Sequence, residues 1–125
     1  MHKFFQRSPR QVAPALVGMT LQVGDKQATI TEVKPQYAKD NENWTDRPIF
    51  DPHPADAYVA PFRGFHLLLL RTGTPGQNTC VRIDGVEIDG QVHSSPAKVC
   101  KALGIDSERT CKVHLAHNVV SLSWS

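Results

Sequence analysis

Hydrophobic and polar residues alternate along much of this chain, in short runs that end at glycine or proline. The runs MTLQV (19–23) and QATITEVK (27–34) flank the turn GDK and predict a β-hairpin. GFHLLLLRT (64–72) is apolar on both faces, which is typical of a central buried strand. TCVRIDGVEIDG (79–90) predicts one or two more strands, and the tail TCKVHLAHNVVSLSW (110–124) predicts one strand or a hairpin.

Two segments carry the start and stop signals of short helices. The first, near residues 9–17, opens on Ser8 as N-cap and Pro9 in the first turn, although Pro14 is expected to break it early. The second, near residues 96–103, opens on SSP and ends at a glycine, and it carries an apolar stripe. These signals predict only two helices.

Residues 35–62 hold more than half of the chain's prolines and show no period. They predict a long ordered loop beside a functional pocket. A chain of 125 residues is one domain of ordinary size. We therefore expect residues 1–125 to form a single α+β domain, built from a mainly antiparallel sheet and two short helices.

Composition and charge narrow the classes of function. Apolar residues make up 40% and charged residues 21%, which is normal for a soluble globular protein. No apolar run approaches the roughly 20 residues of a membrane-spanning helix, and the N-terminus lacks the apolar stretch of a secretory signal. A net charge of +2 permits nucleic-acid binding without requiring it. We expect a cytoplasmic protein with no membrane contact.

The cysteine and histidine patterns predict neither a metal nor a cofactor. Cys80, Cys100 and Cys111 are an odd number without paired spacing, so free buried thiols are expected. CKVHLAH also offers His114 and His117, but a strand places His114 on the opposite face from Cys111 and His117. Three zinc ligands must converge, and this arrangement does not let them.

Five segments occur in an order that has a parallel in one enzyme family. They are FFQRSPRQVAPALVGMTLQV (4–23), ITEVKPQ (30–36), TDRPIFDPHPADAYVAPFRGFHLLLL (45–70), CVRIDGVEIDG (80–90) and SSPAKVCKALGID (94–106). In this order they resemble the alkyladenine (3-methyladenine) DNA glycosylase family, which carries motifs such as I-T-E-V-E-A-Y and G-P-G-K-L-x-x-A-L-G-I at these places. The resemblance implies the glycosylase fold, in which the mainly antiparallel sheet is curved. It also implies kinship with enzymes that flip a damaged base out of DNA and cut its glycosidic bond with a glutamate-activated water.

The chain matches this family at scaffold positions and departs from it at chemical ones. Lys34 stands where the family has its water-activating glutamate. Gln36 and Ala60 replace the two tyrosines that stack on the flipped base, although the neighbouring Tyr58 is retained. Arg63 aligns with the tyrosine that wedges into the duplex. The resemblance thus implies that the family's catalysis is lost.

Further departures concern the walls of the expected pocket. Leu70 aligns with the pocket asparagine of the family and Asp84 with an arginine. The family's D-x-A-x-H loop is missing, and YAKDNENW (37–44) stands between the flanking motifs. We expect a shallower pocket with this segment folded across its rim and with Lys34 pointing into it.

The departures predict a shortened, catalytically degenerate member of the family. We expect a non-catalytic protein that binds a nucleotide-like anionic small molecule or nucleic acid, because the replaced positions supply hydrogen-bond donors. The ligand-binding residues would be Lys34, Gln36, Arg47, Tyr58, Ala60, Arg63 and His66. Sequestration of a nucleotide by a phage or mobile element against host defence would suit such a scaffold.

Two rival functions stay open. An active glycosylase would need a rebuilt site in which Asp51, Asp56 or Glu32 acts as general base. Alternatively, Lys34 would act as an amine nucleophile. A DNA-binding module would instead use Arg63 as a minor-groove or intercalating residue, and a protein inhibitor is the remaining alternative in this class.

Overall fold

The computed structural model describes residues 2–37, 56–73 and 79–124. Within them the chain forms two α-helices, one 3-10 helix and an eight-stranded sheet. In chain order the elements are η1 (Lys3–Gln6), α1 (Pro9–Leu16), β1 (Thr20–Val23), β2 (Lys26–Tyr37), β3 (Ala57–Phe62), β4 (Phe65–Thr72), β5 (Thr79–Ile88), β6 (Gln91–His93), α2 (Pro96–Ala102), β7 (Arg109–Ala116) and β8 (Val119–Trp124). The predicted α+β class is confirmed.

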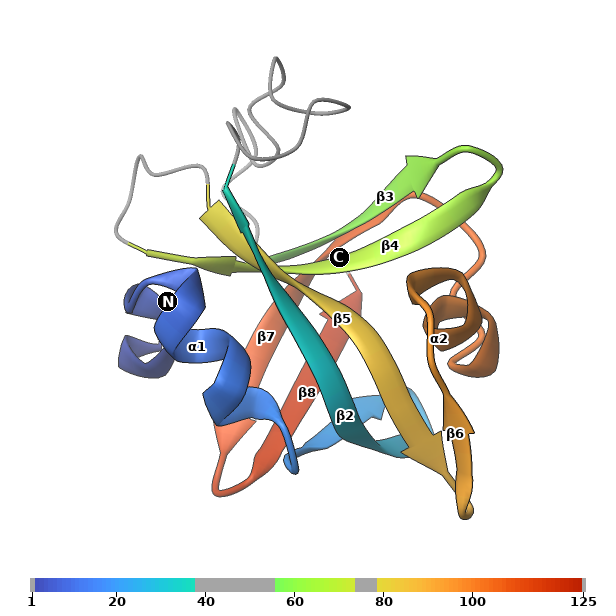
Figure 1. Ribbon diagram of the computed structural model, residues 1–125, viewed down its shortest axis with the longest axis horizontal. Coiled ribbons are helices and arrows are strands. Elements are labelled where there is room, and N and C mark those ends of the chain that lie inside the picture. Colours follow the sequence, from blue (N-terminus) through green and yellow to red (C-terminus); the bar gives the residue numbers. More distant parts are fainter. Residues whose placement is uncertain (1, 38–55, 74–78, 125) are drawn as a thin grey trace.

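The sheet closes on itself into a ring (Figure 1). Its strand order is β2-β1-β8-β7-β3-β4-β5-β6, and β2 also pairs with β5, so seven strands form the ring and β6 extends β5 alone. All of these pairings are antiparallel except the one between β1 and β8. A sheet that closes must be curved, and this closure gives the curvature that the sequence predicts.

Alternation along the strands decides which side chains fill the ring. In β4, Leu68 and Leu70 belong to the main core inside the ring, whereas Leu67 and Leu69 belong to a smaller apolar cluster on the outside. All four side chains are buried. The prediction of a central strand that is buried on both faces is therefore confirmed.

The two helices lie on opposite sides of the ring (Figure 1) and contribute apolar residues to the same main core. In α1, Val12 and Leu16 are fully buried, and the helix continues through Pro14 to end at Leu16. In α2, Ser95 Oγ accepts a hydrogen bond from Lys98 N at 3.1 Å, so the N-cap that the sequence predicts is formed. Both helices therefore lie within a residue of their predicted bounds.

The predicted loop at 35–62 is wrong at both ends. Strand β2 continues to Tyr37, and Ala57–Phe62 form β3; residues 38–55 lie outside the described part of the chain. The prolines in these strands are tolerated because each strand has only one partner there. Pro35 pairs with Val81 of β5, while β1 pairs with β2 only up to Thr29; Pro61 likewise lies beyond the β7 pairing. A proline without an N–H fits such a one-sided position.

Candidate ligand-binding face

The register of four neighbouring strands brings several predicted site residues onto one face. Residues directly opposite each other in an antiparallel pair lie on the same side of the sheet. Lys34 of β2 is opposite Arg82 of β5, Arg82 is opposite Leu69 of β4, and Leu69 is opposite Tyr58 of β3. A row of four side chains thus crosses the outside of the ring.

Two further rows flank the first, one on each side of it. On one side Gln36 is opposite Cys80, and on the other side Ala60 is opposite Leu67. We call the three rows together the outer face. Its residues are Lys34, Gln36, Tyr58, Ala60, Leu67, Leu69, Cys80 and Arg82.

The middle of the outer face is apolar. Leu67, Leu69 and Cys80 are buried in one cluster, against which Tyr58 and Ala60 pack. Burial raises the pKa of the Cys80 thiol to about 12, so this cysteine is a neutral apolar group and not a nucleophile. The face therefore has a buried apolar floor between its polar ends, and only Tyr58 and Ala60 are half-buried there.

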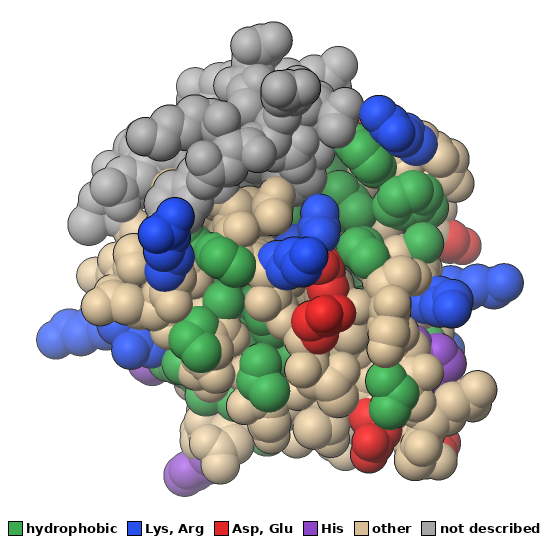
Figure 2. All heavy atoms as spheres, in the orientation of Figure 1, with side chains coloured by type: hydrophobic (Ala, Val, Ile, Leu, Met, Phe, Trp, Pro, Cys, Tyr) green, Lys and Arg blue, Asp and Glu red, His purple; other side chains and the backbone are tan. Residues whose placement is uncertain are grey.

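Charged groups gather at the β2–β5 end of this floor. The Arg82 guanidinium donates from Nε to Asp84 Oδ1 at 2.5 Å and from Nη2 to Asp84 Oδ2 at 2.8 Å, which is a two-point contact. The hydrogen bond to Asp84 raises the pKa of Arg82, burial opposes this, and the charges of Asp84 and Glu32 add to the rise. Figure 2 shows Lys and Arg side chains beside Asp and Glu side chains in the middle of this surface.

The side chain of Lys34 is exposed. The expectation that Lys34 points into a pocket, away from bulk solvent, is therefore not met. Its position on an open sheet face explains the difference, because β2 at this point has β5 on one side and no partner strand among the described residues on the other. Lys34 is available to a ligand that lies on the face.

A double irregularity in the β2–β5 ladder positions Glu32 and Asp84. The register shifts between Ile30 and Glu32 and again between Glu32 and Val33. Gly85 lies against this bend, where a Cβ would meet Thr31 Oγ1 at 2.6 Å. A side chain at this position does not fit, so the glycine is required for the strands to approach.

On the β3 side of the face, Tyr58 is held by an acid from another element. Its hydroxyl donates a hydrogen bond to the Glu108 carboxylate just before β7. Asp56, one of the rival general bases, accepts a hydrogen bond from Val113 N to Oδ2 at 3.1 Å. This bond ties Asp56 to the β7 backbone, which is a structural role.

Other predicted residues do not join the outer face. His66 and Leu70 lie on the opposite side of β4; Leu70 is in the main core, and His66 lines a separate cavity beside α2. Arg63 is exposed at the β3–β4 turn with φ +49°, and its guanidinium lies 5.2 Å from the Phe62 ring centre. Arg47, Asp51 and most of the segment 37–44 fall outside the described residues.

Sequence reasoning missed Arg82 as a member of the site. The alternation in CVRIDG does place Arg82 on the same side as Cys80, but only the pairing of β5 with β2 brings it beside Lys34. Among the described residues, no cluster of His, Cys, Asp or Glu is arranged to hold a metal ion. No helix in that part of the chain is long and apolar enough to cross a membrane.

Comparison of the sequence with protein-family models and with curated proteins gives no match.

Proposed function

We propose that this protein is a non-catalytic binding protein that holds a nucleotide-like anionic ligand on the outer face. The observation that carries the proposal is the cross-strand pair of Lys34 and Arg82, with Gln36 next along β2. An ammonium and a guanidinium side by side form a site for a phosphate group. The half-buried side chains of Tyr58 and Ala60, which pack against the apolar floor, give the ring of a nucleotide a surface to lie on.

Asp84 fixes the orientation of Arg82 for a phosphate ligand and offsets the charge of its guanidinium. The two-point contact fixes the guanidinium and takes two of its five N–H donors, which leaves three for a ligand. The Arg82 side chain is therefore already ordered in the free protein, and ligand binding loses less conformational entropy. The exposed Lys34 supplies the second cation from the neighbouring strand.

The same residues argue against the glycosylase reaction. A general base needs a lone pair that takes a proton from water, and the ammonium of Lys34 has none. Gln36 and Ala60 offer no aromatic surface where a flipped base would be stacked. The rival acid Asp56 is engaged by the β7 backbone. Binding without hydrolysis is what this set of side chains supports.

The test compares adenosine 5′-monophosphate with adenosine by isothermal titration calorimetry. We expect the monophosphate to bind at least tenfold more tightly, and Lys34→Gln to remove most of that difference. Lys112→Gln, which neutralises an exposed lysine on β7 outside the face, is the matched control and should leave both affinities unchanged. Equal affinity for the two compounds, or equal effects of the two variants, would overturn the proposal.

One further observation favours a second candidate, binding of duplex DNA through the β3–β4 hairpin. Arg63 and Gly64 form its two-residue turn with φ values of +49° and +86°, and the strands that carry it extend away from α1 (Figure 1). Phe62 and Phe65 pack edge to face at 5.6 Å behind the turn, so Arg63 is presented on a stiff base. An arginine presented in this way suits the minor groove of DNA.

Affinity for a plain duplex, measured over a series of salt concentrations, decides this second candidate. DNA binding predicts that the affinity falls steeply with salt, because phosphate contacts release counterions. Arg63→Ala should then weaken binding and reduce the salt slope. A duplex affinity that Arg63→Ala leaves unchanged would exclude the hairpin as the contact.

A further inference from the structure

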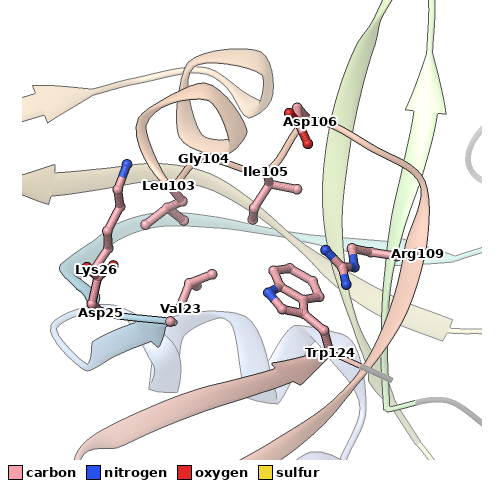
Figure 3. Close-up of a pocket in the computed structure, with 10 residues that line it drawn as sticks. Val23, Asp25, Lys26, Leu103, Gly104, Ile105, Asp106, Arg109 and Trp124 are labelled. Atoms are coloured by element: carbon pink, nitrogen blue, oxygen red, sulfur yellow. The ribbon is translucent and has the colours of Figure 1, made fainter.

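A cavity of about 260 Å³ lies away from the outer face, between the β1–β2 turn, the C-terminal end of α2 and the ends of β7 and β8 (Figure 3). Apolar side chains form much of its wall: Val23 of β1, Leu103 and Ile105 after α2, and Trp124 of β8. The indole of Trp124 projects into the cavity. This wall is unrelated to the proposed nucleotide site.

The charged residues of the cavity stand at its edge and include both signs. Asp106 and Arg109 lie on one side, while Asp25 and Lys26 lie on the other (Figure 3). Lys26 is engaged, because its Nζ donates to the Ala102 carbonyl at the end of α2 at 3.3 Å. The pair on the Trp124 side is the one that remains for a ligand.

Arg109 and Asp106 do not neutralise each other. The Arg109 guanidinium lies over the Trp124 ring, 4.2 Å from its centre, and no carboxylate among the described residues is within ion-pair distance of it. Asp106 has no hydrogen-bond or ion-pair partner in the same part of the chain. A cation and an anion therefore lie near an apolar wall and do not form an ion pair with each other.

We propose that this cavity binds a small zwitterion with an apolar body, such as a free α-amino acid with an apolar side chain. The ligand's carboxylate accepts hydrogen bonds from Arg109, and its ammonium donates to Asp106. Its side chain packs against Trp124 and Ile105. A ligand with a single charge would leave one of the two protein charges uncompensated as it covers them.

The size of the cavity agrees with this class of ligand. A volume of about 260 Å³ has room for roughly nine waters at about 30 Å³ each, or for a ligand of about ten heavy atoms. It is below the range of about 300–1,000 Å³ that suits drug-sized ligands. A free amino acid with a branched aliphatic side chain fits this limit.

The test uses L-leucine and two matched analogues that each lack one charge: 3-methylbutylamine, without the carboxylate, and 4-methylpentanoate, without the ammonium. The chain has two tryptophans, so in a Trp44→Phe background the fluorescence reports on Trp124 alone. We expect a saturable change with leucine and at least tenfold weaker binding of both analogues. A response to either analogue that equals the leucine response, or no saturable response to leucine, would overturn the proposal.

Charge variants give a second, independent reading. Arg109→Gln and Asp106→Asn should each lower leucine affinity at least tenfold, and Arg109→Gln should also shift the Trp124 emission of the free protein. Lys112→Gln on β7 and Asp89→Asn in the β5–β6 turn are matched controls outside the cavity, and they should bind leucine unchanged. Leucine affinity that is insensitive to Arg109→Gln and Asp106→Asn would place the binding elsewhere and contradict the assignment.

Discussion

Gly85 of β5 lies so close to Thr31 of β2 that a Cβ on the glycine would stand 2.6 Å from the threonine Oγ1. The close approach occurs where the β2–β5 register shifts twice, and it places Glu32 and Asp84 at the edge of the outer face. The geometry of the charged end of the candidate site thus depends on the absence of one side chain.

Gly85→Ala is expected to destabilise the protein by about 1–3 kcal/mol, because overpacking forces the strands apart. Urea unfolding measures the loss. Thr31→Ala removes the atom that the new Cβ would meet, so the double variant Gly85→Ala/Thr31→Ala should be less destabilised than the sum of the two single variants. Strictly additive effects would show that the contact does not limit the approach of the strands.

Asp84→Asn is expected to cost about 1–3 kcal/mol of stability, because it leaves the Arg82 guanidinium without its charge partner. The cost stays below that of a fully buried pair, since 20% of the Arg82 side chain is exposed, against 5% for Asp84. Asp89→Asn is the control: Asp89 lies exposed in a turn at φ +52°, which asparagine tolerates, and its change should be within about 0.5 kcal/mol. Equal losses in urea unfolding would contradict a structural role for the Arg82–Asp84 pair.

The helices could be predicted from the sequence because their signals are local. Ser95 and Pro96 define the start of α2 within one turn of chain, and the Ser95 hydroxyl makes the cap that its position implies. The closure of the ring could not be predicted in this way. It depends on the pairing of β1 with β8 and of β2 with β5, which join residues far apart in the sequence.

Part of the candidate site could also be predicted from the sequence. Resemblance pointed to Lys34, Gln36, Tyr58 and Ala60, and the register places these four on one face. His66 does not join them because strand residues alternate between faces, and a position one residue away from Leu67 faces the other side. Strand β3 was predicted as part of a loop because of its proline. A strand tolerates proline where it has a partner on one side only, and composition does not reveal where that is.

Burial of the three thiols predicts a loss of stability at alkaline pH. Burial raises the pKa of Cys80 and Cys100 from an ordinary value of 9.0 to about 12, and that of Cys111 to about 11. The unfolded chain releases these protons near pH 9 while the folded protein keeps them. The contribution of the buried thiols to the free energy of unfolding is therefore fully present below pH 9. It is lost as pH rises toward 11, by about 1.4 kcal/mol per pH unit for each thiol.

Urea unfolding between pH 7 and 10.5 measures this slope. Cys80→Ala lowers stability at every pH by leaving a cavity. It should also reduce the slope of unfolding free energy against pH above pH 9 by about 1.4 kcal/mol per pH unit, which is the contribution of one thiol. A slope that Cys80→Ala leaves unchanged would mean that the Cys80 thiol ionises as readily in the folded protein as in the unfolded chain.

Lys34→Glu should abolish nucleotide binding and leave the fold intact. Loss of one charge-assisted hydrogen bond costs about 1.5–3 kcal/mol, and the new carboxylate also repels the phosphate, so adenosine 5′-monophosphate should bind at least tenfold more weakly. The same change introduces the glutamate that the resemblance to the glycosylase family places at this position. It should still not produce base excision, because Gln36 and Ala60 give a flipped base no stacking surface. Release of free base from a duplex containing hypoxanthine or an alkylpurine is the measurement, with Lys112→Glu as the control for added charge. Base release by the unmodified protein that disappears in Lys34→Ala would identify a working enzyme and contradict the non-catalytic proposal.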